Sequence, residues 1–267
     1  MYSLRRDTLP AYFHIMSNVF KKLCRLAGET VAKYRLIEDG DRILVGVSGG
    51  KDSLTLMHVL TRLQQAAPVK FSLECVTFDP GFPEFGTPEI EAYCREQQWH
   101  HRTLKMDIAA IVQEKGFDRA PCVLCSRLRR GKLYGLAQEL NCNKLALGQH
   151  LDDIVSSMLI SLCRGQGLTT MAPRVQPDDP AYPAVIRPLA LIPESLIVEY
   201  SATLTLPRTG ICRYREQLQQ GDRAYFKGVI ESLSEYIPDL RSNIAHSLGK
   251  VEIDHLLVVP PPEEKTP

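Results

Sequence analysis

The sequence has no run of about 18 apolar residues, and its first 16 residues lack the apolar stretch of a signal peptide. It therefore predicts neither a membrane-spanning helix nor secretion, and we expect a cytoplasmic protein. It also has almost no net charge, because 32 Lys and Arg offset 31 Asp and Glu to leave +1. This balance excludes a histone-like cation and an acidic tail protein. The 267 residues, of which 44% are hydrophobic, suit one large globular domain or two small ones.

Cysteine is too sparse for a disulfide scaffold, which is usually shorter and denser in cysteine. The eight cysteines include one C-x-x-C pair, Cys122 and Cys125, with no second such pair and no H-x3–5-H partner. The spacing therefore argues against a zinc finger. In the reducing compartment that we expect, a C-x-x-C pair is more typical of a metal or redox site than of a structural bridge.

Apolar periodicity predicts short strands that alternate with helices over the first 163 residues. The expected strands are Arg42–Val47, Phe71–Phe78, His101–Met106 and Lys144–Leu147. The expected helices are Ser17–Glu38, Ser53–Gln65, Glu89–Gln98, Cys122–Leu140 and Leu151–Cys163. This alternation is typical of βαβ units, so we expect an α/β fold, a parallel sheet with helices on both faces.

The pattern changes after Arg164, where Gly and Pro recur up to Pro188 and predict a long connection. Further helices are expected at Pro193–Thr203, Asp222–Tyr236 and Asp239–Leu248. We therefore divide the chain into an N-terminal helical segment (1–40), a sheet domain (41–169), a small C-terminal helical extension (170–255) and a disordered tail (256–267).

The segment Ser48–Ser53, Ser-Gly-Gly-Lys-Asp-Ser, follows the first expected strand and opens a helix. Its glycines allow a sharp turn and a close approach to a ligand, and the amides at the helix start bind anions. It is not a Walker A loop, because Gly46 lies one residue too close to Gly50 and Asp52 replaces the expected Ser or Thr. A carboxylate inside a phosphate loop indicates a divalent cation that bridges Asp52 to the phosphates.

A basic segment surrounds the cysteine pair, since 119–132 contains five cations and no acid. Two cysteines at i and i+3 present their sulfurs on one side of a helical turn, which suits a shared metal or cluster. The cations suit contacts with nucleic-acid phosphates. The RNA contacts that we expect are Arg127, Arg129, Arg130 and Lys132.

A third cysteine ligand is expected at Cys212, which the C-terminal extension carries. Spacing alone does not choose it over Cys142 or Cys163, although both of those lie on apolar patterns typical of core thiols. Three cysteines would leave one position open on a four-iron cluster.

Three segments lie at the ends of expected strands or just after them: Ser48–Ser53, Phe78–Phe85 and Gly148–Asp153. Ligands of open α/β sheets bind beyond the carboxyl ends of the strands. We therefore predict that the three segments converge on one site.

Four segments and a later cysteine together resemble a known family. In chain order the segments are Ser48–Ser53, Pro121–Gly131, Gly148–Asp153 and Val185–Leu189. The first looks like the pyrophosphate loop (PP-loop) of the adenylating ATP pyrophosphatases, and the whole set resembles the tRNA 2-thiocytidine synthetases. The resemblance spans roughly residues 18–255 and implies the α/β fold of the PP-loop pyrophosphatase domain.

The resemblance also implies ATP, Mg²⁺ and a [4Fe-4S] cluster. Cys122, Cys125 and Cys212 would ligate the cluster. The ATP site would consist of Ser48, Gly49, Gly50, Lys51, Asp52, Ser53, Gly148 and His150. Asp52 would hold Mg²⁺ together with Asp152 and Asp153, although these last two could instead only cap the following helix. The catalytic residues would be Asp52, Arg129 and Asp153.

The implied reaction is an ATP-dependent thiolation of tRNA. The enzyme would adenylate the C2 carbonyl of cytidine, at position 32 of the anticodon loop, and sulfur would then displace AMP. The implied partners are tRNA and a cysteine desulfurase as the ultimate sulfur donor, and the implied assembly is a homodimer.

Three departures from the family pattern concern the RNA target more than the chemistry. Gln149 replaces a His, Cys212 is followed by Arg213 and Tyr214 in place of Gly and Ser, and the loop before Pro80 is short.

Three alternatives stay open. They are a cluster-free thiolase that carries a persulfide on Cys122 or Cys125, a PP-loop enzyme that attaches an amine, and an RNA-binding protein with a decayed ATP site.

Overall fold

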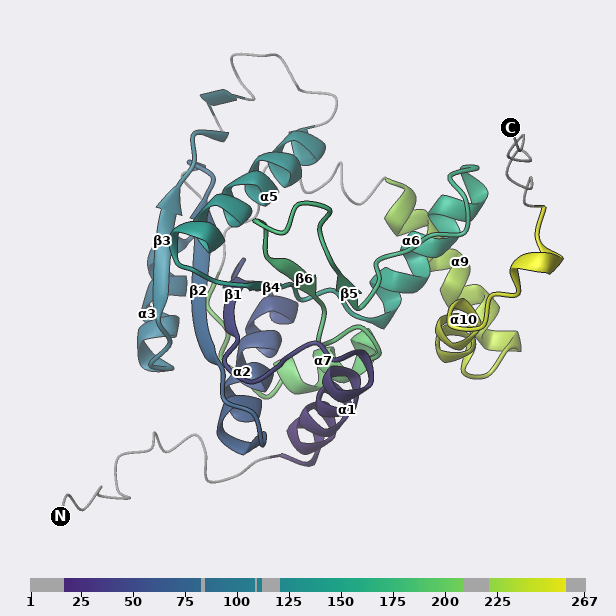
Figure 1. Cartoon of the computed structure of the whole chain (residues 1–267), viewed down its shortest axis with the longest axis horizontal. Helices are drawn as coiled ribbons and strands as arrows, with labels where there is room; N and C mark the ends of the chain where they lie inside the picture. Colours follow the sequence, from purple (N-terminus) through teal and green to yellow (C-terminus); the bar gives the residue numbers. More distant parts are fainter. Residues whose placement is uncertain (1–16, 83–84, 109, 112–120, 209–220, 258–267) are drawn as a thin grey trace, which may run out of the picture.

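The computed structural model describes residues 17–82, 85–108, 110–111, 121–208 and 221–257 (Figure 1). Its strands form one six-stranded sheet in the order β3-β2-β1-β4-β6-β5. They are β1 (Arg42–Gly46), β2 (Ser72–Asp79), β3 (His101–Lys105), β4 (Lys144–Ala146), β5 (Arg174–Val175) and β6 (Ala184–Ile186). All neighbours pair in parallel except β5, which runs antiparallel to β6 at the edge.

The α-helices follow the strands in the alternating order that the sequence predicts. They are α1 (Asn18–Tyr34), α2 (Lys51–Ala66), α3 (Thr87–Glu96), α5 (Pro121–Glu139), α6 (Leu151–Cys163), α7 (Glu194–Ser201), α9 (Asp222–Tyr236) and α10 (Leu240–Leu248). A short 3-10 turn, η2 (Ile253–His255), ends the described chain. The predicted α/β fold, with its C-terminal helices, is confirmed.

Both faces of the sheet are covered, as the apolar strands require. In β1, Ile43 and Val45 pack against one core, which α1, α2, α3 and α7 complete, whereas Leu44 packs against a second core beneath α5. Successive residues of a strand point to opposite faces, so an apolar run such as this one needs cover on both sides. Figure 1 shows α5 and the group α1, α2 and α7 on opposite sides of the strands.

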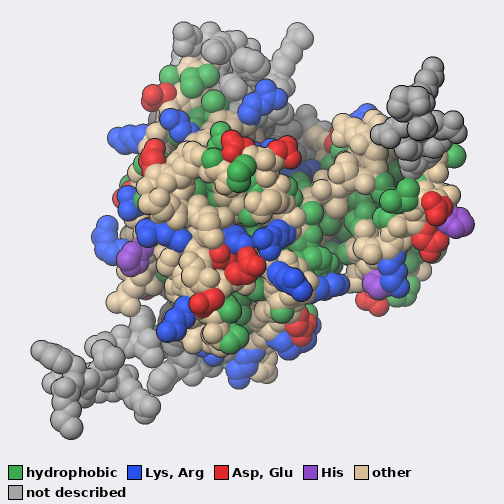
Figure 2. Space-filling model, viewed as in Figure 1, with side chains coloured by type: hydrophobic (Ala, Val, Ile, Leu, Met, Phe, Trp, Pro, Cys, Tyr) green, Lys and Arg blue, Asp and Glu red, His purple; other side chains and the backbone are tan. Residues whose placement is uncertain are grey.

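A third, smaller cluster holds the C-terminal helices. Leu151 and Val155 of α6 pack against Ile230 of α9 and Leu240 of α10. At the far end of α6, Arg164 donates to both carboxylate oxygens of Asp222, at 2.6 and 3.2 Å. Figure 2 shows hydrophobic side chains in the hollow between these helices and the body of the sheet.

The structure corrects two expectations. The segment expected as a long connection contains β5 and β6, which at two and three residues are too short to show a period. Cys163, expected as a core thiol, is exposed because it is the last residue of α6, beyond the part of the helix that packs. Cys142 is buried as expected.

The expected divisions near residues 40, 169 and 255 remain predictions, and most of the expected disordered tail, 258–267, lies outside the described residues. Within the described ranges, no helix combines the length and apolar character needed to cross a bilayer.

Candidate functional site

The sheet order places two of the predicted segments side by side. The order runs outward from β1 to β3 on one side and from β4 to β5 on the other, so the strand order reverses between β1 and β4. These two strands pair directly, with Val45 opposite Ala146. The loops that leave their carboxyl ends, 47–50 and 147–150, therefore emerge together, which is where doubly wound sheets bind ligands.

Gly148 shows how closely the two loops approach. A Cβ atom built on Gly148 would lie 3.1 Å from the carbonyl carbon and oxygen of Asp52 and 3.3 Å from the amide nitrogen of Ser53. Those atoms are backbone and cannot rotate away. A side chain at position 148 would therefore force the second loop or the start of α2 to shift by a few tenths of an ångström.

The loop Ser48–Ser53 is shaped by its own side chains. The Ser53 Oγ accepts from the Ser48 amide at 3.1 Å and donates to the Gly50 carbonyl at 3.0 Å. Gly49 adopts a φ of 79°, a left-handed conformation that favours glycine. No side chain caps the N-terminus of α2, so its first amides are available to an anion. This geometry fits the expected phosphate loop.

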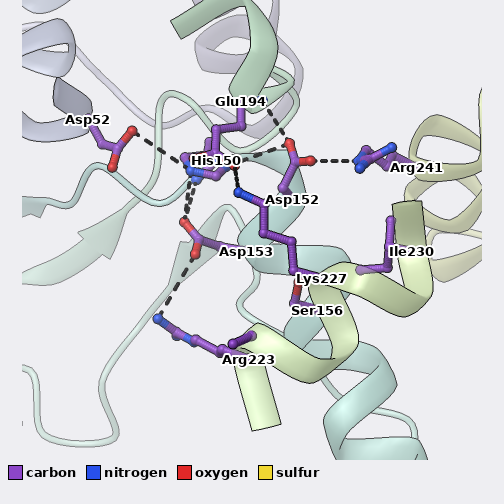
Figure 3. A pocket seen from close by; sticks show the side chains of 11 residues that line it. Asp52, His150, Asp152, Asp153, Ser156, Glu194, Arg223, Lys227, Ile230 and Arg241 are labelled. Atoms are coloured by element: carbon purple, nitrogen blue, oxygen red, sulfur yellow. Dashed lines mark hydrogen bonds and ion pairs between the residues drawn. The ribbon is translucent and has the colours of Figure 1, made fainter. Parts of the chain in front are cut away.

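A cavity of about 280 Å³ opens beside this loop (Figure 3). Four acids and three bases line it, together with one histidine and three other residues. The acids are Asp52, Asp152, Asp153 and Glu194, and the bases are Arg223, Lys227 and Arg241. The segments Ser48–Ser53 and Gly148–Asp153 thus contribute to one site. The third expected segment, Phe78–Phe85, contributes no described residue to the lining, and its residues 83 and 84 lie outside the described ranges.

His150 stands at the centre of the acids and is 5% exposed. Its Nε2 lies 3.8 Å from Asp52 Oδ1 and 3.5 Å from Asp153 Oδ2, and its Nδ1 lies 3.7 Å from Asp152 Oδ2. These separations are too long for good hydrogen bonds, and the buried Nδ1 has no partner in the described structure. Buried polar atoms are normally satisfied, so the arrangement is typical of a site that a ligand completes.

Asp152 is fully engaged by protein groups. Its Oδ1 accepts from Arg241 Nε of α10 at 2.5 Å, and its Oδ2 accepts from the Glu194 amide at 2.7 Å. It therefore ties the start of α6 to α7 and α10, a role that the expected Mg²⁺ ligation does not require.

Asp153 caps the first turn of α6, because its Oδ2 accepts from the His150 amide at 3.2 Å. The side chain also faces the cavity, where Oδ1 lies 4.0 Å from Arg223 Nη1. Asp52 and Asp153 approach the same nitrogen of His150, so these two carboxylates suit a divalent cation shared with phosphate, whereas Asp152 suits it less. Among the described residues, no group of three His, Cys, Asp or Glu is already arranged to hold a metal ion.

A chain of ion pairs crosses the cavity from the loop to α9. Lys51 Nζ lies 2.7 Å from Asp52 Oδ1 and 2.9 Å from Glu194 Oε1, and Lys227 Nζ lies 2.9 Å from Glu194 Oε2. Burial alone would raise the pKa of Glu194, but the hydrogen bonds from Lys227 and Lys51 outweigh it and lower that pKa to about 2. Glu194 is thus an anion held between two ammonium groups.

Gln149, one of the departures from the family pattern, also has a defined contact. Its Oε1 accepts from Arg187 Nε at 2.9 Å, and Arg187 Nη1 donates to the Ala172 carbonyl at 2.6 Å. Burial and then the positive charge of Arg130 on α5 lower the pKa of Arg187. Arg187 therefore lies between the loop that follows β4 and the basic helix.

The cysteine helix is confirmed as a helix, with Cys122 and Cys125 in its first turns. Cys125 is half-buried, whereas the side chain of Cys122 and the whole of Cys212 lie outside the described residues. The expected RNA contacts Arg127, Arg130 and Lys132 are exposed, and Arg129 is half-buried, one turn after Cys125 on the same face. None of these four cations lines the cavity.

Sequence reasoning missed Glu194, Arg223, Lys227 and Arg241, which come from the C-terminal extension. Glu194 follows a proline at a helix start, Arg223 and Lys227 stand on a helix of mixed charge, and Arg241 stands on a short polar helix. Such positions are typical of solvated faces, so no local signal distinguishes them from surface residues.

Comparison with known proteins places the chain in a family. Residues 18–207 match the family model described as a PP-loop domain. A tRNA-cytidine(32) 2-sulfurtransferase of Syntrophotalea carbinolica is 40% identical over 91% of this chain and 94% of its own length. The protein of the same name from Geobacter sulfurreducens is 40% identical over 89% and 93%.

A solved structure shares the fold. The U34-tRNA thiolase NcsA from Methanococcus maripaludis, solved with its [4Fe-4S] cluster, has a TM-score of 0.71 at 20% identity, over 89% of this chain and 80% of that one. The sequence matches to the two sulfurtransferases cover about nine tenths of this chain and of each relative. The match to the family model includes both loops that meet at the cavity. The chain therefore belongs to the PP-loop family and, within it, to the group of the tRNA-cytidine(32) 2-sulfurtransferases.

Proposed function

We propose that the protein is an ATP-dependent tRNA thiolase that replaces the C2 oxygen of a cytidine, at position 32 of the anticodon loop, with sulfur. One observation carries the proposal. The phosphate loop and the acidic segment Gly148–Asp153 meet at one cavity, in a chain that is 40% identical to the curated sulfurtransferases over nearly its whole length. The likeness to a tRNA thiolase structure supports the same fold.

The cavity suits the phosphate chain of ATP better than a whole nucleotide. Its volume of about 280 Å³ lies near the lower end of small-molecule sites, which is roughly 300 Å³. The uncapped start of α2 and the Lys51 ammonium supply positive charge on one side. Asp52 and Asp153 would hold Mg²⁺ against the phosphates, which would remove the repulsion between carboxylates and phosphate.

In the first step, the cytidine C2 oxygen attacks the α-phosphorus of ATP, and pyrophosphate leaves. The oxygen of an inert carbonyl becomes part of a good leaving group. The start of α2, Lys51 and the cation held by Asp52 would stabilise the charge that develops on the phosphates. In the second step, a sulfur nucleophile attacks C2 and AMP departs with the former carbonyl oxygen.

Three cysteines would bring sulfur to this site. A [4Fe-4S] cluster held by Cys122, Cys125 and Cys212 would supply an iron that no protein side chain occupies, where sulfur can bind. The two cysteines of α5 start a helix whose amides and neighbouring cations favour thiolates. The sulfur would come ultimately from a cysteine desulfurase, and the working assembly would be a homodimer.

The exposed cations of α5 would hold the tRNA backbone, since Arg127, Arg130 and Lys132 all face outward. Arg129 would reach the reacting base, because it shares a helix face with Cys125. A base in an anticodon loop can be turned out of the stack without the opening of a duplex, so only one nucleotide of the tRNA need approach the bound ATP.

Mass spectrometry of tRNA nucleosides from cells that lack the protein tests the function. We expect 2-thiocytidine to be lost, to return with the wild-type gene, and not to return with Asp153→Asn. If 2-thiocytidine stays unchanged while another modified nucleoside disappears, the assigned target is wrong. A second assay mixes the purified protein with ATP and tRNA and measures AMP. If no AMP is released with any tRNA, the protein is instead an RNA-binding protein without this activity.

Iron and acid-labile sulfide in anaerobically purified protein test the cluster. Full activity without iron would favour the persulfide alternative, in which Cys122 or Cys125 carries the sulfur and Cys212 resolves it. An amine-attaching enzyme would behave differently. Cys122→Ala would leave its ATP turnover unchanged, and it would form product with ammonia or lysine as the acceptor.

A further inference from the structure

The side of the cavity opposite the phosphate loop is formed by α9. Lys227 and Arg223 stand one helical turn apart on this helix, and Figure 3 shows both side chains extending toward the acids of the site. Lys227 reaches Glu194 at 2.9 Å, and Arg223 lies 4.0 Å from Asp153. Helices α9 and α10 thus supply cations to a cavity whose other walls come from the phosphate loop, the start of α6 and the start of α7.

The charges of the cavity are unevenly compensated. Arg241 neutralises Asp152, and Lys51 and Lys227 neutralise Glu194, while Asp52 shares Lys51 with Glu194. A phosphate chain brings several more negative charges, so the site needs cations that can turn from carboxylate to phosphate. Arg241 is unsuited to this, because its bond to Asp152 also fixes the junction of α6 with α10.

Lys227 is suited to this role in both geometry and freedom. An ammonium group has three N–H donors, and within the described part of the chain that of Lys227 contacts only Glu194. About half of its side-chain surface is exposed, so the flexible stem can move without breaking a core contact. Helix α9 itself is held independently, through Ile230 in the cluster with α6.

Glu194 explains why two lysines from distant segments lie together before any nucleotide is bound. Its two oxygens bind one ammonium each, Lys51 from the loop and Lys227 from α9. Its backbone amide is fixed by Asp152, so the carboxylate occupies a defined place at the start of α7. The two ammonium groups, one from each side of the cavity, are therefore held close together with one carboxylate between them.

We propose that Lys227 binds the β- and γ-phosphates of ATP from the α9 side of the cavity, across from the loop Ser48–Ser53, and that Glu194 is a positioning residue that bridges it to Lys51. The inference rests on the proposed function, because it takes ATP to be the nucleotide. It adds that the C-terminal extension completes the phosphate site.

Calorimetric titration of the full-length protein with the Mg²⁺ complex of α,β-methylene-ATP tests the inference, since this analogue cannot be cleaved between its α- and β-phosphates. We expect Lys227→Ala to weaken its binding roughly tenfold, the loss typical of one charge-assisted hydrogen bond at a half-exposed site. Lys227→Arg keeps the charge and should recover most of the affinity. Lys250→Ala is the matched control, because Lys250 is exposed and does not line the cavity.

AMP separates a phosphate contact from a general disturbance of the site. It lacks the β- and γ-phosphates, so Lys227→Ala should leave AMP affinity unchanged. An equal loss for AMP and the analogue, or an unchanged affinity for the analogue, would overturn the assignment of Lys227. If the wild-type protein binds neither nucleotide, the proposed function fails together with the inference, whereas a wild type that binds normally beside an unaffected variant refutes the inference alone.

Discussion

Gly148→Ala should damage the nucleotide site through a single methyl group. The added Cβ would lie 3.1 Å from two backbone atoms of Asp52 and 3.3 Å from the amide of Ser53. Carbon atoms prefer separations of about 3.5–4.0 Å, so one loop has to move by roughly a few tenths of an ångström. Overpacking of this kind typically costs about 1–3 kcal/mol of unfolding free energy.

The same movement should impair ATP binding, because it displaces the amides of Asp52 and Ser53 at the start of α2. Hydrogen bonds lose strength when the donor moves out of a range of about 2.7–3.2 Å. We expect the dissociation constant for α,β-methylene-ATP to rise roughly tenfold, which corresponds to about 1.4 kcal/mol. Urea denaturation gives the stability, and calorimetric titration gives the affinity.

Gly135→Ala is the control for this experiment. Gly135 lies inside α5, and an added Cβ would meet no atom within 4 Å. Alanine suits a helix interior better than glycine, so this variant should be more stable by about 0.4–1 kcal/mol and should bind the nucleotide normally. If Gly148→Ala also binds the analogue and unfolds like the wild type, the two loops do not meet as described and the site is wrongly assembled.

Three further predictions address charge, cluster and RNA. The pKa of Glu194 is lowered from 4.5 to about 2, so its contribution to stability is present above pH 4.5 and is lost as the pH falls toward 2. Glu194→Gln should therefore flatten the curve of unfolding free energy against pH between these two values. Cys212→Ser should abolish bound iron and acid-labile sulfide, whereas Cys163→Ser, at an exposed position, should leave both unchanged; equal loss in the two variants would argue against the assigned ligands. Arg130→Ala should lower the slope of log affinity for tRNA against log salt by about 1 and leave ATP affinity intact. Arg25→Ala, exposed on α1, is its control and should keep the slope.

The fold was predictable where a signal is long and contiguous. Strands β1 and β2 are apolar runs with core contacts on both faces, and α2 between them repeats Leu56, Leu60 and Leu63 at helical spacing, so their positions follow from the sequence. Strands β5 and β6 were not predictable, because two or three residues between prolines carry no period. The antiparallel pairing of β5 also cannot be inferred from alternation alone.

The residues of the site likewise fall into a group that the sequence reveals and a group that it does not. Ser48–Ser53 and Gly148–Asp153 are recognisable because all of their functional groups lie within six residues, and β1 and β4 then place the two segments together. Lys227 and Glu194 belong to different helices, and only packing brings them to the loop. A lysine on a mixed-charge helix looks the same in sequence whether it faces solvent or phosphate.

The ion pairs of the cavity connect nucleotide binding to the position of α9. Asp152 joins α6 to α7 and α10, and Glu194 joins the loop to α9, so the C-terminal helices contact the sheet domain through the same charges that surround the nucleotide. A phosphate chain that takes Lys227 replaces a contact between two parts of the protein with one through the ligand. Nucleotide binding and the placement of α9 are therefore thermodynamically linked. The factor by which ATP favours the docked α9 equals the ratio of the ATP affinities with α9 docked and with α9 detached.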